Sequence, residues 1–151
     1  MVERPSLDLA PTFQRLYVRY ESQKMGFLVG CRPIIGLDGC HLKGIYSGQL
    51  LSVVGRDGND NMFLIAVAVV EIENKDSWTW FLKELMDDIG TVQQRGWTFI
   101  SDKQKGLTEI FNDIMPNADH RLCLRHMYTN FKKVYKGMEL KELMWKVAAA
   151  G

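Results

Sequence analysis

The sequence predicts an α/β protein built on one mixed sheet, in which three antiparallel strands are followed by parallel strands and helices flank the sheet. Three observations favour this class. Three apolar runs follow one another in the first half of the chain, an Asp-Gly pair separates the second run from the third, and after residue 71 helical and strand patterns alternate. A length of 151 residues suits one domain.

The composition excludes several classes of protein. Hydrophobic residues make up 46% and charged residues 25% of the chain, and 19 Lys and Arg against 18 Asp and Glu give a net charge of +1. These values are normal for a globular protein and argue against disorder. No run approaches the roughly 18 apolar residues of a membrane span. The odd number of cysteines, 3, is typical of a reducing compartment.

The first half of the chain is expected to form one helix and then three strands. Apolar side chains recur at helical spacing over residues 12–26 and predict a helix there. Strands are predicted over residues 33–38, 50–55 and 62–70; the third is almost wholly apolar and should be covered on both faces. The Asp57-Gly58 turn predicts that the second and third strands form an antiparallel hairpin.

The second half of the chain alternates between helices and short strands. Apolar residues from Trp78 to Ile89 predict a helix that Asp76 or Ser77 caps and Gly90 ends. A strand is then expected over 97–102, a helix over 107–114, and a short strand over 119–123. The last two helical patterns cover residues 124–135 and 140–147.

Two aspartates, Asp38 and Asp102, stand at the ends of predicted strands. If those strands are parallel neighbours, both carboxylates emerge at one sheet edge, where ligands bind in open α/β sheets. Two ionised carboxylates close together favour a cation between them, and oxygen ligands favour Mg²⁺ or Mn²⁺ over zinc. The plainer interpretation, which the spacing alone favours, is that Asp38 belongs to a turn and Asp102 caps a helix.

Cys123 and His126 have the Cys-x-x-His spacing of a metal-ligand pair. A structural zinc site needs about four ligands. Cys40, His41 and His120 could contribute, but the sequence has no second pair, so zinc is not expected. A core cysteine and a helix-start histidine are the plainer interpretation. Lysines near the end of the chain are weak evidence for a nucleic-acid surface; they are Lys132, Lys133, Lys136, Lys141 and Lys146.

Longer segments around these residues resemble plant Mutator-like (MULE) transposases. RPIIGLDGCHLKG, residues 32–44, resembles the first catalytic-strand motif, and ISDKQKGL, residues 100–107, resembles the second. HRLCLRH, residues 120–126, resembles the Cys-x-x-His motif of that family. The similarity runs from about residue 13 to residue 150, and the motifs are specific when taken together.

This resemblance implies a ribonuclease H-like fold with a DDE-type nuclease site. Asp38 and Asp102 would be metal ligands for Mg²⁺ or Mn²⁺, and the reaction would be phosphodiester cleavage and strand transfer. The implied partner is DNA at transposon ends, and the implied compartment is the nucleus. A small-molecule substrate and a membrane partner are not expected, and homo-oligomerisation stays open.

The chain also departs from the family pattern. The third acidic residue of the family, a Glu, normally follows on a helix beyond an inserted helical region, and Glu139 and Glu142 lie where that insertion would start. We therefore predict three parts: a helical segment over residues 1–30, the transposase core over 31–126, and a truncated insertion over 127–151. Such a fragment would lack activity alone. The alternatives are a domesticated DNA- or protein-binding module in transcription regulation and a non-functional transposon relic.

Overall fold

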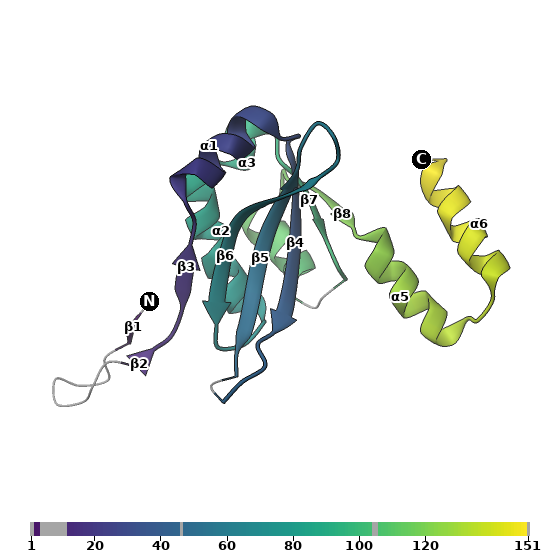
Figure 1. Ribbon diagram of the computed structural model, residues 1–151, viewed down its shortest axis with the longest axis horizontal. Helices are drawn as coiled ribbons and strands as arrows, with labels where there is room; N and C mark the ends of the chain where they lie inside the picture. The colour runs from purple at the N-terminus through teal and green to yellow at the C-terminus, as the bar shows by residue number, and fades with distance from the viewer. Residues whose placement is uncertain (1, 4–11, 46, 104–105, 151) are drawn as a thin grey trace.

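Six strands form one mixed sheet in the computed structural model, which describes residues 2–3, 12–45, 47–103 and 106–150 (Figure 1). Their spatial order is β3-β6-β5-β4-β7-β8. The strands are β3 (Leu16–Val18), β4 (Ile34–His41), β5 (Gln49–Arg56), β6 (Met62–Val70), β7 (Thr98–Ser101) and β8 (Asp119–Leu122). The pairs β3–β6, β6–β5 and β5–β4 are antiparallel, whereas the pairs β4–β7 and β7–β8 are parallel. The predicted mixed α/β sheet is confirmed.

The hairpin between β5 and β6 forms where the Asp-Gly turn predicts it. The two strands pair antiparallel from Gln49 opposite Val70 to Arg56 opposite Met62. The carboxylate of Asp57 accepts hydrogen bonds from the backbone N–H groups of Asn59 and Asn61, both at 2.8 Å. A short aspartate side chain that bonds to its own turn in this way fixes the chain reversal.

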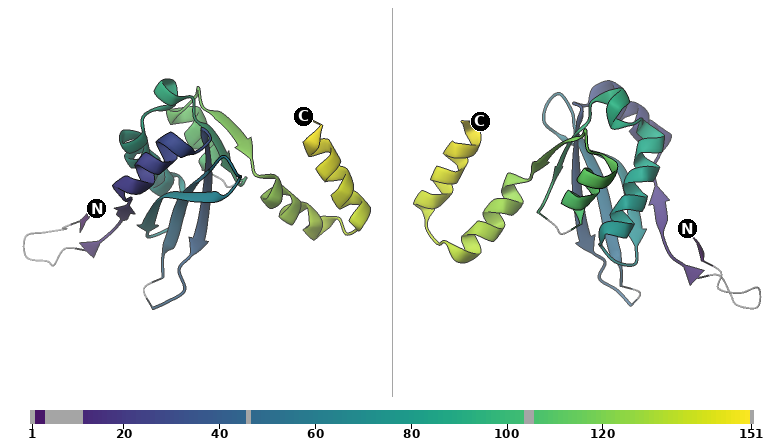
Figure 2. Two further views of the ribbon diagram at one scale, coloured as in Figure 1. Left: turned by 45° about the horizontal axis from the view of Figure 1, so that its top comes forward. Right: turned by 180° about the vertical axis from the view of Figure 1, so that it is seen from behind.

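Helices α2 (Lys75–Ile89) and α4 (Leu107–Ile114) cover one face of the sheet, as Figure 2 shows from behind. α1 (Glu21–Gly30) and the short α3 (Val92–Arg95) lie at one end of it. The predicted apolar stripe of α2 is buried: Trp78, Phe81, Leu82, Leu85 and Ile89. Gly90 ends α2 as expected. Asn74, and not Asp76 or Ser77, caps α2, because its side chain accepts a hydrogen bond from Ser77 N–H at 2.9 Å.

The opposite face of the sheet is turned toward the viewer in Figure 1, away from α2 and α4. Buried and half-buried residues alternate along β5. One face of this strand is therefore packed, and the other is partly open to solvent. The expectation that residues 62–70 are covered on both faces is wrong, since Leu64 keeps 43% of its surface exposed. The apolar run of β6 therefore provides one core face and one partly exposed apolar face.

The predicted helix over residues 12–26 is wrong in its first half. Thr12–Phe13 forms β2, which pairs with β1 (Val2–Glu3) in a separate two-stranded ribbon. β3 adds to the open edge of β6, and the helix begins only at Glu21. Apolar spacing alone could not reveal this, because the free edge of β6 supplies hydrogen-bond partners that a local pattern does not contain.

Polar contacts to α2 and to the segment just before it hold β3 in place. Arg15 is buried, and its guanidinium bonds to the carboxylates of Glu71 and Asp76. Tyr17 donates its hydroxyl proton to Asp88 at 2.7 Å. Burial, reinforced by the bond to Asp88, raises the pKa of Tyr17, so the phenol stays protonated. Arg15, just before β3, and Tyr17 within it are two residues apart, the spacing at which an extended chain presents side chains on one face and a helix does not.

The last two helices, α5 (Leu124–Val134) and α6 (Met138–Ala149), project as a pair from the β8 side of the sheet (Figures 1 and 2). Their apolar faces meet, and the ring of Tyr128 lies edge-on to Trp145 with centroids 5.4 Å apart. Both predicted helical patterns are confirmed. No helix in the described part of the chain is long and apolar enough to cross a bilayer.

Candidate functional site

The paired part of β4 and β7 ends two residues before each of the two predicted site aspartates. The two strands run parallel, with Gly36 opposite Ile100. Asp38 follows Gly36 by two residues, and Asp102 follows Ile100 by two, immediately after β7 ends. Because side chains alternate along a strand, an extension of this register by two residues would put both aspartates on one face of neighbouring strands.

That face is the one turned away from α2 and α4. Ile35 and Leu37, which flank this level of β4, are 0% and 4% exposed, so Asp38 points to the other side and is itself exposed. The Asp38 carboxylate accepts a hydrogen bond from Gly39 N–H at 2.9 Å. Ser52 on β5 donates its hydroxyl to the Asp38 carbonyl oxygen at 3.3 Å. The carboxylate is thus oriented by its own strand and open to solvent.

Ser101 and His120 support the backbone of Asp102 from inside the protein. Ser101 is fully buried, and its hydroxyl donates to the Asp102 carbonyl oxygen at 2.9 Å. The same hydroxyl lies 2.8 Å from Nε2 of His120. The hydroxyl has one proton, and it is donated to the Asp102 carbonyl oxygen. His120 must therefore carry its own ring proton on Nε2 and donate it to the Ser101 oxygen. The His120 ring stacks on the Phe111 ring, with the two centroids 4.0 Å apart. Burial lowers the pKa of His120, so its ring is neutral at pH 7.

Glu73 packs against Gly39 on the face of β4 opposite to the Asp38 side chain. Trp78 donates its indole N–H to Glu73 at 3.1 Å. A Cβ atom on Gly39 would lie 2.5 Å from a carboxylate oxygen of Glu73, which is closer than real Cβ contacts come. A side chain after Asp38 would therefore have to move the Glu73 carboxylate from its place beside Trp78. The sequence predicts neither this contact nor the Ser101–His120 bond, because both join residues that the fold brings together.

A comparison with protein-family models matches residues 34–130 to the MULE transposase domain. The chain belongs to this family. The match covers nearly two thirds of the chain, from the first residue of β4 to α5, and so includes Asp38, Asp102, Cys123 and His126. No curated protein matches the chain. Membership supports a transposase-related function, and a transposase domain implies DNA binding in general.

The Cys-x-x-His segment of this MULE domain starts beside Asp102. Cys123 is the N-cap residue of α5, and its backbone N–H donates to the carbonyl oxygen of Ser101 at 2.6 Å. His126 lies in the first turn of α5, and its Nδ1 is buried with no hydrogen-bond partner among the described residues. The first turn of α5 is thereby tied to the end of β7.

The other candidate ligands are dispersed. Within the described ranges, no group of three or more His, Cys, Asp and Glu side chains gathers as a metal site. Glu139 and Glu142 lie on α6, which stands apart from β4 (Figure 1). Of the basic segment after Asp102, Lys103 is exposed, and Gln104 and Lys105 lie outside the described residues. The donor set at this level of the sheet is therefore Asp38 with Asp102.

Proposed function

We propose that this MULE domain is a ribonuclease H-like, DDE-type catalytic core in which Asp38 and Asp102 hold Mg²⁺ or Mn²⁺. The observation that carries the proposal is the parallel register of β4 and β7, in which the partners Gly36 and Ile100 each stand two residues before an aspartate. Two carboxylates, with water and substrate phosphate, are the donors with which proteins bind Mg²⁺. The donor set therefore fits this class of ion.

The sheet order supports the assigned fold. β6, β5 and β4 form an antiparallel meander, α2 crosses over, and β7 and β8 extend the sheet in parallel on the other side of β4. This order puts the first aspartate on the central strand and the second at the end of its parallel neighbour. Ligands of open α/β sheets bind at the carboxyl ends of the strands where the strand order reverses, and here it reverses at β4.

Each residue of the site has a distinct part in the proposal. Asp38 and Asp102 bind the metal, which when bound stabilises the attacking and leaving oxygens of a phosphodiester. Gly39 N–H orients the Asp38 carboxylate. Ser101, backed by His120, fixes the main chain from which the Asp102 side chain extends. The proposed substrate is DNA at transposon ends, the proposed compartment is the nucleus, and the motifs favour a plant source.

A DDE site needs a third carboxylate, and neither Glu139 nor Glu142 gathers with the two aspartates. We therefore propose that the 151-residue chain binds the metal weakly and does not cut DNA alone. The separation of α6 from the sheet supports this part of the proposal. Metal binding, and not cleavage, is the property to test first.

The test is a Mn²⁺ titration followed by electron paramagnetic resonance of the free ion. We expect the wild type to bind Mn²⁺, and Asp38→Asn and Asp102→Asn each to weaken binding about tenfold or more, which is about 1.4 kcal/mol or more. Asp87→Asn is the matched control, because Asp87 is an exposed carboxylate on α2, on the far face of the sheet. Equal affinity in the wild type and both site variants would overturn the proposal.

A further inference from the structure

Positive charge is concentrated in one helix of the chain. The segment over residues 124–136, which contains α5, has four basic residues and no acidic one, although the whole chain carries only +1. Those residues are Arg125, Lys132, Lys133 and Lys136. The last 28 residues hold 6 basic and 2 acidic side chains, which leaves 13 basic and 16 acidic ones before them. The body of the domain is therefore acidic and α5 is basic.

The cations of α5 also differ from those of the sheet in having no acidic partners. In the body of the domain Arg15, Arg19 and Lys75 are neutralised by nearby carboxylates. Within the described residues, no ion pair involves a side chain of α5 or α6. Lys133 bonds instead to the neutral amide of Asn130 at 3.1 Å. The charge of α5 is available to a partner.

Helical periodicity separates this charge from the apolar side of α5. Lys132 and Lys133 follow Arg125 by seven and eight residues, which is about two helical turns, so the three side chains share a face of the helix. All three are exposed. Apolar residues on the opposite face line a groove with α6; they include Leu124, Met127 and Phe131. We call Arg125, Lys132 and Lys133 the basic face of α5; the half-buried Tyr128 lies at its border with the apolar side.

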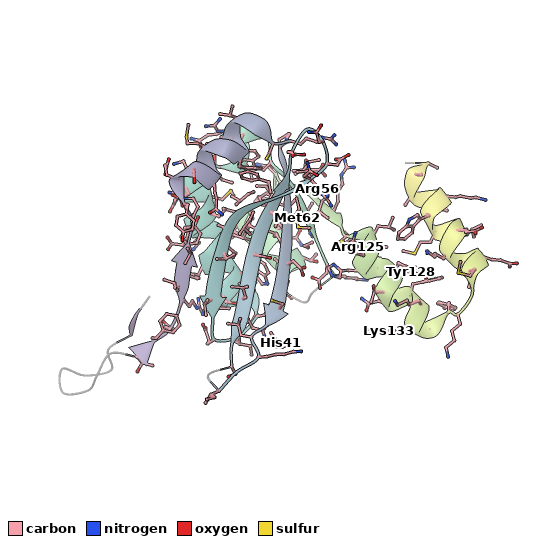
Figure 3. The ribbon with its side chains drawn as sticks, viewed as in Figure 1. His41, Arg56, Met62, Arg125, Tyr128 and Lys133 are labelled. Atoms are coloured by element: carbon pink, nitrogen blue, oxygen red, sulfur yellow. The ribbon has the colours of Figure 1, made fainter. Side chains whose placement is uncertain are left out.

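The Tyr128 ring, which packs edge-on to Trp145 of α6, borders this basic face. The Nζ atoms of Lys132 and Lys141 lie 5.8 and 6.0 Å from the centroid of the Tyr128 ring. Figure 3 shows Arg125, Tyr128 and Lys133 along α5, on the part of the molecule between the sheet and α6. These cation–π contacts orient the Lys132 and Lys141 side chains around the ring without neutralising their charge.

The basic face begins next to the candidate metal site. The bond from Cys123 N–H to Ser101 fixes the start of α5 at the residue before Asp102. Arg125 follows two residues later. Arg125 and Lys132 are about 10.5 Å apart along the helix axis, which matches about three nucleotide steps of one DNA strand at about 3.4 Å each. A strand bound along α5 would lead toward Asp102.

We propose that the basic face of α5 binds the phosphate backbone of duplex DNA, independently of sequence, and leads one strand to Asp38 and Asp102. The destination of the strand rests on the proposed function, whereas the binding does not, because it needs no metal. Each neutralised phosphate releases counterions, so the affinity must fall steeply with salt. Contacts of this kind position the DNA and leave its sequence unread.

Fluorescence anisotropy with a labelled duplex of mixed sequence tests the proposal, over roughly 50 to 200 mM salt with EDTA present. We expect Lys132→Gln/Lys133→Gln to reduce the slope of log Kobs against log salt by about 1.8, which is about 0.9 for each lost contact. Glutamine keeps the helix propensity of lysine. Lys83→Gln/Arg95→Gln removes the same charge from exposed positions on α2 and α3 and should leave the slope unchanged.

A slope equal to that of the wild type in the α5 variant would overturn the proposal, and so would an equal fall in the control variant. Vesicles containing phosphatidylserine are the second probe. Tighter binding of the wild type to these vesicles than to the duplex would assign the basic face to a membrane surface and overturn it too. Because EDTA removes the metal, a failed Mn²⁺ titration leaves this result intact, and the two proposals fail separately.

Discussion

Replacing Arg15 with methionine tests whether β3 is an integral part of the sheet. The Arg15 side chain is 7% exposed, and its Nε lies 2.9 Å from Glu71 while Nη2 lies 2.9 Å from Asp76. The guanidinium also lies over the Trp80 ring, 5.7 Å from its centroid. Methionine keeps the apolar stem and removes the charge, so the substitution isolates the polar contacts.

The expected loss is about 2 kcal/mol in the free energy of unfolding. Hydrogen bonds between charged groups contribute about 1.5–3 kcal/mol when desolvated, but Glu71 and Asp76 are 41% and 82% exposed. Solvent screening reduces their share to about 1–1.5 kcal/mol, and the cation–π contact adds about 0.5–1 kcal/mol. The exposed carboxylates stay hydrated after the change, so the loss falls short of the roughly 3–5 kcal/mol typical of a broken buried pair.

Urea unfolding followed by far-ultraviolet circular dichroism measures this loss. With a slope of about 2 kcal/mol/M, the midpoint should fall by about 1 M. Arg32→Met is the matched control, since its ion pair with Asp60 joins side chains that are 47% and 69% exposed; its cost should stay below about 1 kcal/mol. Equal shifts in the two variants would refute the view that Arg15 anchors β3 to α2.

Three further predictions concern the surroundings of the site. Burial lowers the pKa of His120, so the unfolded chain binds more protons as pH falls below about 6.5, and stability should fall from about pH 7 to pH 5. His120→Gln should flatten this dependence in denaturation curves; an unchanged slope would contradict it. Gly39→Ala must move the Glu73 carboxylate away from Trp78 and should cost about 0.5–1.5 kcal/mol, the contribution of that hydrogen bond, whereas Gly44→Ala, which meets no atom within 4 Å, should be nearly neutral in the same assay; equal costs would contradict the contact between Gly39 and Glu73. Cys123→Ser should leave the zinc content unchanged, because we expect none to be bound; stoichiometric zinc in the purified wild type, measured by atomic absorption, would refute this.

The elements that the sequence predicts well are those whose signal is local. Asp57-Gly58 defines its hairpin through side-chain bonds within the turn. The apolar stripe from Trp78 to Ile89 defines α2, since all its members share one face of one helix. In both cases the residues that make the contact are also close in the chain, so the pattern contains the structural information.

The failures arise where contacts join distant segments. Residues 16–18 have helical spacing, but the edge of β6 recruits them into the sheet. The aspartates could be singled out because each closes an apolar run of the sequence, although Asp38 lies within β4, which continues to His41. Only the pairing of β4 with β7, which places Gly36 opposite Ile100, brings the two segments together. The Ser101–His120 bond has no sequence signal of its own, because it depends on the register of β7 with β8.

The proposed function depends on Asp38 and Asp102 sharing a divalent cation, and a crystal soaked in Mn²⁺ shows whether they do. Anomalous scattering locates manganese without reference to any activity. We expect one anomalous peak between the two carboxylates, with those groups about 4–7 Å apart. Carboxylates more than about 10 Å apart, or manganese bound only elsewhere, would contradict the shared site.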